Sequence, residues 1–392
     1  MPQLSNRVSS FTDSVIRRMT RIANQYNAVN LSQGFPDFDP PQELKDALRK
    51  AAEGSIHQYA VTWGAQNFRE ALAHKQSKAT GIDINPNTQI VVTCGSTEAM
   101  MASMLTVTNP GDKVVVFSPF YENYGADAIL SGAEPIYVHL RPPHFNFDVE
   151  ELEAAFKQHP KAIILCNPSN PTGKVFTREE LQIIADFAIK YDVFVITDEV
   201  YEHIVYEPYK HIYFASLPGV ADRTISCGSL SKTYSITGWR LGYVIAPPEI
   251  TDSIRKVHDF LTVGAAAPLQ EAAVTALSFN DDYYKELQKH YTEKKDFFLQ
   301  GLERLRLKYT VPQGAYYVMV DVSEFGVTDD VKFCEWLVQE VGVAAVPGSS
   351  FFKSDVNHLI RFHFAKNEET LAAALNRLEA LREKTQSKAW EK

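Results

Sequence analysis

A short polar segment near the middle of the chain, residues 229–240, places one lysine among hydroxyl groups and one arginine. Lys232 follows Ser229 and Ser231, and Arg240 stands eight positions after it. A lysine in a dry cleft can be neutral at physiological pH and can form a Schiff base with a carbonyl compound. Hydroxyl groups together with an arginine suit a bound phosphate. The segment therefore predicts a reactive amine beside an anion site, and a solvated loop of basic residues is the alternative.

A carboxylate and an amide follow two other apolar segments. Asp198 comes directly after the apolar residues 194–197, where a buried carboxylate is costly unless it is paired. A protonated ring nitrogen would be a suitable partner, and Tyr201 could reach the same ligand; the alternative is a helix N-cap. Asn170 lies in the segment 167–173, whose two Asn-Pro pairs predict a rigid loop. Asn170 is thus either a donor to a ligand oxygen or part of a tight surface turn.

A third candidate site begins at a glycine. Gly95, Ser96 and Thr97 follow the apolar residues 89–94 and precede a predicted helix. The first N–H groups of a helix are free to bind an anion. Taken alone, however, these three residues favour simple helix capping.

Other catalytic motifs find weaker support. The segment around Lys232 also matches the S-x-x-K motif of serine β-lactamases, and residues 121–123 resemble their Y-x-N element. The order of the two elements is reversed here, and no K-T-G occurs. Residues 173–174 lack the flanking residues of a P-loop, and the chain has no G-x-G-x-x-G and no H-E-x-x-H. A nicotinamide-dependent or zinc-protease function therefore loses its main support, and no metal site is expected.

Seven apolar segments predict the strands that position these residues. Most are apolar throughout rather than alternating, which is typical of strands covered on both faces. They alternate with amphipathic segments, of which 177–190 is the clearest, with Thr177 as its cap and Glu180 three residues later. This alternation predicts an α/β fold with a mostly parallel, doubly wound sheet, and ligands bind beyond the carboxyl ends of such strands. The predicted strands are 89–94, 113–117, 134–140, 161–166, 194–197, 224–228 and 243–246.

The last third of the chain has a different pattern. A long helical stretch is predicted over residues 268–307. Beyond it, a smaller α+β domain is predicted, with strands 315–322 and 359–364 and helices 329–341 and 368–384. The residues before about position 40 have no predicted sheet of their own. We therefore expect an N-terminal segment (1–40) that packs with the small domain, a large domain (41–285) and a small C-terminal domain (286–392).

The composition fits a globular protein of the cytoplasm. The 392 residues carry 39 Lys and Arg against 48 Asp and Glu, and 45% are hydrophobic, which excludes a disordered chain. The net charge of −9 argues against binding to nucleic acid or to an anionic membrane. We find no signal-peptide core and no apolar run of about 18 residues. The four cysteines form no C-x-x-C pair, so free thiols in a reducing compartment are expected.

Together and in this order, these residues resemble the fold-type-I aminotransferases of class I/II, which depend on pyridoxal 5′-phosphate (PLP). Residues 30–38 (Asn-Leu-Ser-Gln-Gly-Phe-Pro-Asp-Phe) and 258–263 (His-Asp-Phe-Leu-Thr-Val) are most similar to the kynurenine, glutamine and methionine aminotransferases. The resemblance covers almost the whole chain. It implies the type I fold with a seven-stranded sheet, PLP in the large domain, and a homodimer with shared active sites.

The resemblance also implies a role for each matched residue. Lys232 would carry PLP as an internal aldimine and move a proton between the substrate Cα and C4′ of the cofactor. Asp198 would keep the pyridine nitrogen protonated, which makes the ring an electron sink. Tyr201 and Asn170 would contact the 3′-oxygen, and Tyr121 would stack on the ring. The residues implied at the phosphate are Gly95, Ser96, Thr97, Ser229, Ser231 and Arg240.

Three further residues are implied at the substrate and at the partner subunit. Arg361 would clamp the α-carboxylate of the substrate with two hydrogen bonds, with the Gly34 backbone and Asn170 beside it. Tyr59 would reach the phosphate in the second subunit. These matches imply ping-pong transfer of an amino group from an L-amino acid to a 2-oxo acid.

The resemblance implies the preferred amino acid less clearly than the reaction type. Aspartate-preferring members place a second cation for the side-chain carboxylate, in some of them directly after the phosphate glycine, where this chain has Thr97 and Glu98. We therefore expect neutral or aromatic amino acids, with which Trp63 and Tyr124 near the matched site are compatible. The alternatives are an aspartate-preferring transaminase, a cysteine-S-conjugate β-lyase on the same cofactor, and a cofactor-free binding or serine-acylating protein that uses the S-x-x-K serine and lysine.

Overall fold

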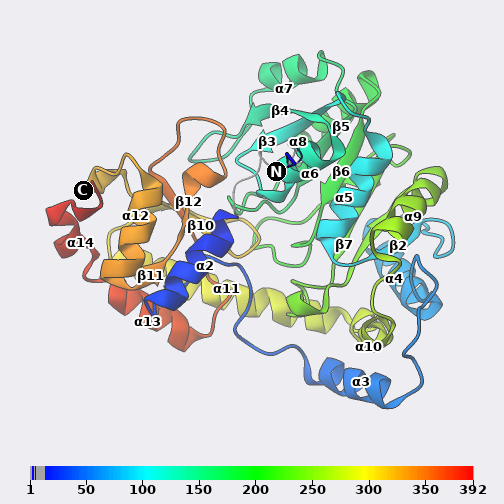
Figure 1. Cartoon of the computed structure of the whole chain (residues 1–392), viewed down its shortest axis with the longest axis horizontal. Coiled ribbons are helices and arrows are strands. Elements are labelled where there is room, and N and C mark those ends of the chain that lie inside the picture. The colour runs from blue at the N-terminus through cyan, green and yellow to red at the C-terminus, as the bar shows by residue number, and fades with distance from the viewer. Residues whose placement is uncertain (1, 4, 6–13, 392) are drawn as a thin grey trace.

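A seven-stranded sheet forms the centre of the larger part of the molecule (Figure 1). The computed structural model describes residues 2–3, 5 and 14–391, so residues 1, 4 and 6–13 of the predicted N-terminal segment lie outside it. All seven predicted strands are confirmed, with ends that shift by at most one residue. In chain order they are β2 (Ile90–Thr93), β3 (Lys113–Ser118), β4 (Glu134–His139), β5 (Ala162–Cys166), β6 (Phe194–Asp198), β7 (Thr224–Ser229) and β8 (Gly242–Ile245).

The sheet is mostly parallel, as predicted. The spatial order is β2-β8-β7-β6-β5-β3-β4, and β8 runs antiparallel to both of its neighbours. The pairs from β7 to β4 are all parallel. The carboxyl ends of six strands therefore lie along one edge, which is where ligands bind in folds of this class.

Helices cover both faces of the sheet, which explains the continuously apolar strands. In β3, Val114 and Val116 pack against one set of helices, and Val115 and Phe117 pack against another. The first set is α5 (Ser96–Val107), α6 (Asn123–Ser131) and α9 (Pro248–Thr262). The second set is α7 (Val149–Phe156) and α8 (Arg178–Lys190), and α3 (Gln42–Glu53), α4 (Gln66–Thr80) and α10 (Ala267–Leu277) cover the end of the sheet at β2 and β8.

Helix ends follow local side-chain chemistry. The Thr177 hydroxyl accepts the backbone N–H of Glu180, and the Glu180 carboxylate accepts that of Thr177, so the predicted capping box of α8 is present. The predicted helical stretch 268–307 is two helices, α10 and α11 (Asp281–Arg304). Asn280 separates them, because its side chain caps α11 by accepting two N–H groups of the new helix.

The rest of the chain forms a smaller part, at the left of Figure 1. An antiparallel sheet in the order β12-β13-β10-β9 packs with helices in one apolar cluster. The strands are β9 (Lys308–Thr310), β10 (Tyr317–Asp321), β12 (Val346–Pro347) and β13 (Leu359–His363). The helices are α12 (Asp330–Trp336), α13 (Glu368–Leu378) and α14 (Leu381–Lys384). The predicted helix 368–384 is thus two helices, and α12 continues as a π-helical turn over Leu337–Val341.

The described N-terminal residues lie against this smaller part. Helix α2 (Val15–Gln25) places Met19 and Ala23 in the same apolar cluster. Strand β1 (Val29–Asn30) pairs in parallel with β11 (Val343–Ala344). The exact domain limits at residues 40 and 285 stay predictions. None of the helices in the described part of the chain combines the length and apolar character that a membrane crossing requires.

Candidate active site

A large open cleft lies where the carboxyl ends of the parallel strands meet the smaller part of the molecule. Its empty space, counted out to the solvent at its mouth, is about 2010 Å³. Lys232 after β7, Asp198 at the end of β6 and Arg361 in β13 all line it. The structure therefore brings together an amine, a carboxylate and a guanidinium that are far apart in the sequence. The other predicted residues that line the cleft are Gly34, Ser96, Thr97, Tyr121, Tyr124, Asn170, Tyr201, Ser231 and Arg240.

Lys232 is the amine of the cleft. Its Nζ lies 3.4 Å from the carbonyl oxygen of Gly34, to which it donates. Burial lowers the pKa of Lys232 to about 8; the negative charge of Asp198 opposes this shift, and the positive charges of Arg240 and Arg361 add to it. Near neutral pH the unprotonated, nucleophilic form of Lys232 is therefore far more populated than that of an ordinary lysine.

Asp198 is a buried carboxylate with one strong donor. The Tyr124 hydroxyl donates to its Oδ2 at 2.7 Å, and the backbone N–H of Val200 lies 3.4 Å from its Oδ1. Burial raises the pKa of Asp198 above its ordinary value, and the hydrogen bond from Tyr124 works against that rise. A cation bound beside this carboxylate would favour its ionised form.

Arg361 is a fully buried cation whose hydrogen-bond partners are neutral. Nη1 donates to Oδ1 of Asn170 at 2.6 Å, and Nη2 donates to the carbonyl oxygen of Ser32 at 2.8 Å. Its Nε has no partner, and no carboxylate of the described residues pairs with it. The guanidinium carbon lies 4.2 Å from the centre of the Tyr317 ring. A buried guanidinium with spare donors is suited to bind a carboxylate from outside the protein.

Two tyrosines connect Arg361 with the floor of the cleft. The Tyr201 and Tyr317 hydroxyls are 2.8 Å apart. Gly34 faces Tyr317 closely, because a Cβ at position 34 would lie 2.3 Å from the Tyr317 hydroxyl. Tyr316, the neighbour of Tyr317, donates to the same Gly34 carbonyl that Lys232 contacts. The backbone at Gly34 therefore takes part in the cleft directly.

The opposite end of the cleft is shaped for an anion. Gly95 has a φ of +81° immediately before α5, and a Cβ there would lie 2.1 Å from Nη2 of Arg240. The glycine thus allows the Arg240 guanidinium to approach the N-terminus of α5. Ser96 and Ser231 line the same end. Free N–H groups, hydroxyls and a guanidinium together fit a phosphate.

Four residues that the sequence placed at the site do not line this cleft, and one of them is Gly95, which lies between the lining residues Cys94 and Ser96. Ser229 lies behind it, where its hydroxyl is 2.7 Å from Oγ of Ser231 and 3.0 Å from the carbonyl oxygen of Leu241. Tyr59 is 85% exposed and lies outside the cleft of its own chain. Trp63 packs against Arg255, whose guanidinium carbon lies 4.7 Å from the indole ring. The roles of all predicted site residues stay predictions at this point.

The cleft contains a further buried carboxyl group, Asp127, which the sequence did not single out. It stands one helical turn after Tyr124 in α6 and lines the cleft, and its Oδ2 has no partner. Burial, with the nearby charge of Asp198, raises the pKa of Asp127 to about 8. The spacing of Tyr124 and Asp127 on one helix face was the available signal, but it resembles ordinary helix packing.

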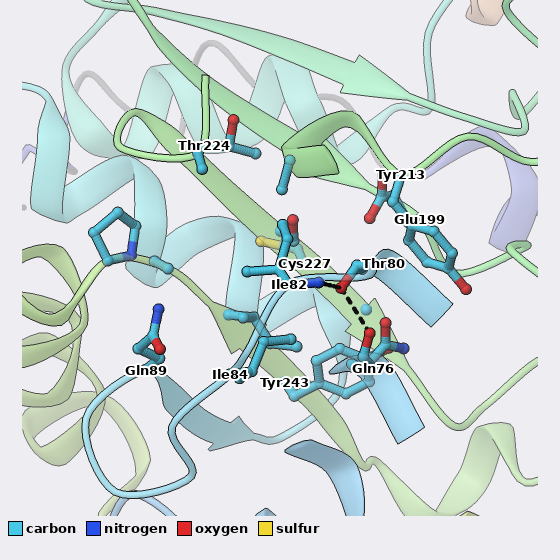
Figure 2. Close-up of a pocket in the computed structure, with 17 residues that line it drawn as sticks. Gln76, Thr80, Ile82, Ile84, Gln89, Glu199, Tyr213, Thr224, Cys227 and Tyr243 are labelled. Carbon is cyan, nitrogen blue, oxygen red and sulfur yellow. Dashed lines mark hydrogen bonds between the residues drawn. The ribbon is translucent and has the colours of Figure 1, made fainter. Parts of the chain in front are cut away.

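Glu199, next to Asp198, serves a different cavity. Successive residues of a strand point to opposite faces, so Asp198 enters the cleft while Glu199 points away from it. Figure 2 shows the pocket that Glu199 lines together with Gln76, Tyr213 and Tyr243; its empty space, counted out to the solvent, is about 580 Å³. Burial raises the pKa of Glu199 to about 8. The two consecutive carboxyl groups therefore belong to separate environments.

Comparison with known proteins identifies close relatives. A family model described as aminotransferase class I and II matches residues 26–378. The chain is 38% identical to a methionine aminotransferase of Escherichia coli, over 94% of this chain and 96% of the relative. It is 36% identical to a kynurenine–oxoglutarate transaminase of Dictyostelium discoideum, over 95% of each chain. The solved structure of N-succinyldiaminopimelate aminotransferase from Mycobacterium tuberculosis superposes with a TM-score of 0.94 at 34% identity, covering 97% of this chain and 100% of that one.

Proposed function

The chain belongs to the aminotransferase class I and II family, whose cofactor is PLP, and we propose that it moves an amino group from an L-amino acid to a 2-oxo acid at Lys232. The convergence of Lys232, Asp198 and Arg361 on one cleft carries this proposal. When bound, PLP supplies an aldehyde that takes up the amino group and a ring that accepts the electron pair left at Cα.

The residues of the cleft fit this cofactor. Arg240 and the N-terminus of α5 would hold its phosphate, and the close approach of Arg240 to Gly95 supports that place. Asp198 would hold the ring nitrogen, because it is a buried carboxylate that lacks a strong cationic partner. Tyr121 would cover one ring face, and the Tyr201 hydroxyl with the Asn170 amide would contact the 3′-oxygen. Each of these groups opens into the cleft.

The protein groups then have distinct tasks. The Lys232 amine would be released when substrate binds, and as a free base it would take the proton from Cα and return it at C4′. Ionised Asp198 would hold a proton on the ring nitrogen throughout. Arg361 would bind the α-carboxylate of the donor and of the acceptor in turn. Because both substrates need the same Arg361 and Lys232, they must bind one after the other, which gives ping-pong kinetics.

We propose neutral or aromatic amino acids as the preferred donors. Glu98 stands where a second cation would bind a side-chain carboxylate, and it is paired with His258. Relatives named for methionine and kynurenine agree with this preference. Arg17 also reaches the cleft from α2, but its side chain is exposed at the mouth. Aspartate therefore belongs in the substrate panel as the contrasting donor.

We also propose a homodimer, in the cytoplasm. Exposed apolar side chains lie on two segments, residues 59–61 and residues 260–263. The contact of the His258 ring with the Thr62 carbonyl oxygen holds these segments next to each other. Tyr59 is 85% and Phe260 is 92% exposed, and Leu261 of the same surface lines the cleft. We call this surface the apolar patch; its members are Tyr59, Val61, Phe260, Leu261 and Val263. A second copy of the chain would cover it and bring Tyr59 to the partner site.

Replacing the amine tests the proposed function. Wild-type protein should shift the absorption band of added PLP and transfer amino groups from methionine or phenylalanine to 2-oxoglutarate or pyruvate, with less transfer from aspartate. Lys232→Ala should still bind PLP but leave its absorption band near that of free PLP, and its transamination rate should fall by about a thousandfold or more. Lys285→Ala, at an exposed position in α11, is the control and should behave as wild type. Wild-type protein that leaves the band of PLP unshifted, or full activity of Lys232→Ala, would refute the proposal.

A further inference from the structure

His258 is a fully buried histidine in α9 whose two ring nitrogens each face an acceptor. Its Nδ1 lies 2.7 Å from Oε1 of Glu98, and its Nε2 lies 2.8 Å from the carbonyl oxygen of Thr62. Neither a carbonyl oxygen nor an ionised carboxylate can donate a hydrogen bond. A neutral imidazole has a single N–H and would satisfy one of these contacts. Both contacts are hydrogen bonds when His258 is an imidazolium cation.

Glu98 has the contacts of an ionised carboxylate. Its Oε2 accepts the backbone N–H of Cys94 at 2.5 Å, and its Oε1 accepts the Thr262 hydroxyl at 2.8 Å. Burial opposes the charge, but the hydrogen bonds from His258 and Cys94 hold the pKa of Glu98 below its ordinary value. Burial also opposes a charge on His258, yet the hydrogen bond and charge of Glu98 raise the pKa of that ring above its ordinary value. The two groups therefore form a buried ion pair.

This ion pair stands beside the anion end of the cleft. Glu98 is the third residue of α5, and its bond to the Cys94 N–H closes the turn 94–98 around Gly95. An unpaired carboxylate in that turn would repel a phosphate dianion, and screening is weak where water is scarce. The positive ring of His258 cancels this charge.

His258 also connects the turn 94–98 with the apolar patch. Thr62 lies in the same loop as Tyr59, between α3 and α4, and Phe260 follows His258 by two residues in α9. Helices α5 and α9 pack against each other on the same face of the sheet (Figure 1). One buried ring therefore contacts the proposed phosphate site and the loop that leads to the proposed dimer surface.

We propose that His258 is a positioning residue for the phosphate of the cofactor, a cation that neutralises Glu98 and ties the turn 94–98 to the loop at Thr62. The inference rests on the proposed function, because it needs the phosphate of PLP at the start of α5. It adds a requirement beyond the direct contacts to the phosphate. Glu98, the carboxylate beside the phosphate, must have its own counter-ion, which is His258.

Binding of PLP and of pyridoxal, which lacks the phosphate, tests this charge requirement. Dissociation constants are measured by equilibrium dialysis on the full-length chain freed of cofactor. His258→Gln should weaken PLP binding by about tenfold or more, because it leaves Glu98 uncompensated. Pyridoxal binding should change by less than about twofold, since pyridoxal carries no dianion for Glu98 to repel. An equal loss for both ligands would mean a merely structural role and would overturn the inference.

Removing both charges completes the test. The double variant Glu98→Gln with His258→Gln should recover most of the PLP affinity that His258→Gln loses, because no unpaired carboxylate remains. Glu98→Gln alone should bind PLP at least as tightly as wild type, and this variant keeps the test open where His258→Gln fails to fold. A double variant as weak as His258→Gln, or a weakened Glu98→Gln, contradicts the inference.

A second histidine–carboxylate pair provides the matched control. His139 and Glu151 are 2.6 Å apart between β4 and α7, and neither lines the cleft. His139→Gln should leave the binding of both ligands unchanged. Failure of the inference is distinguishable from failure of the proposed function. If wild-type protein does not bind PLP, the proposed function is wrong. If folded His258→Gln binds PLP as tightly as wild type, the inference alone is wrong.

Discussion

Two buried carboxyl groups, Asp198 and Asp127, open into the same cleft with different surroundings. Asp198 receives a hydrogen bond from Tyr124, which stabilises its ionised form, whereas Oδ2 of Asp127 has no partner. Because both are buried and close to each other, ionising one disfavours ionising the other. With a pKa of about 8, Asp127 keeps its proton at neutral pH. Of these two carboxyl groups, Asp198 is therefore the one that carries the negative charge.

The proton on Asp127 makes stability depend on pH. Between its ordinary pKa of 3.8 and about 8, the folded protein holds a proton that the unfolded chain releases, so rising pH destabilises the wild type. The variant Asp127→Asn has no proton to lose at this position, so its folding stability does not fall with rising pH on this account. The variant should gain at least about 1 kcal/mol over wild type, roughly 2 °C in Tm, between about pH 5 and about pH 9.

Thermal unfolding of the cofactor-free chain at several pH values provides the measurement. Asp186→Asn, at an exposed position in α8, is the control and should show no pH-dependent gain. A constant difference between Asp127→Asn and wild type across this pH range would show that Asp127 is ionised throughout.

Residues that the sequence could identify share one property: each is polar and directly follows or lies within an apolar strand. Asp198 is the last residue of β6, and Asn170 and Lys232 follow β5 and β7 by a few residues, so the strand pattern pointed to them. Tyr317 was missed, because its contact with Arg361 depends on the pairing of β10 with β13. The alternating pattern of a strand does not indicate which side chain of a paired strand will lie next to its tyrosine.

At the scale of elements, the start of α5 determines the shape of the anion end. Gly95 turns the chain with a φ of +81°, and Arg240 occupies the space that a side chain would need. Gly81, at the end of α4, has a similar φ of +73°, but a Cβ there would meet no other atom within 4 Å. Alanine substitutions at the two glycines therefore distinguish the effect of backbone strain, which both share, from the loss of space for Arg240, which affects only position 95.

The two glycine-to-alanine variants should differ in PLP binding. Both should lose about 1–2 kcal/mol of folding stability, because alanine is strained at positive φ. Gly95→Ala should also weaken PLP binding by about tenfold or more, since Arg240 must move away from the α5 N-terminus. Gly81→Ala should bind PLP as wild type does. Denaturant unfolding and PLP titration measure the two effects, and equal PLP affinities would argue against Arg240 as a phosphate ligand.

The long elements were predictable and the short ones were not. All seven central strands were predicted, because each is an apolar run that helices cover on both faces. Strands β1, β11 and β12 have two residues each, which is too short for any periodic pattern. The break between α10 and α11 was missed because apolar spacing continues across it, although Asn280 supplied a capping signal.

At the scale of the whole molecule, the cleft depends on both parts of the chain. Gly34 comes from the N-terminal segment, Lys232 from the central sheet and Arg361 from the smaller sheet. Sequence order alone could not show that these residues meet, and the family resemblance was what implied it. A change in the relative position of the two parts would separate Arg361 from Lys232, and thereby the proposed carboxylate site from the amine.

The apolar patch predicts how the molecule assembles. Phe260→Asp places a charge at its most exposed member and should convert a dimer into monomers, as measured by light scattering after size-exclusion chromatography. PLP binding should weaken with dimer dissociation, because Tyr59 would no longer reach the partner site. Val311→Asp, at another exposed apolar position, is the control and should leave the dimer intact. A wild-type chain that is monomeric, or a Phe260→Asp variant that stays dimeric, would contradict the assembly.

The unpaired guanidinium of Arg361 has a practical consequence for anyone who measures this enzyme. The neighbours of this buried positive charge are an amide, a carbonyl and aromatic rings, none of which neutralises it. It will therefore bind small anions from a buffer, such as acetate, formate or chloride. Such salts would then compete with the amino acid and inflate its KM. Kinetic constants compared across laboratories should therefore be taken in zwitterionic, halide-poor solutions.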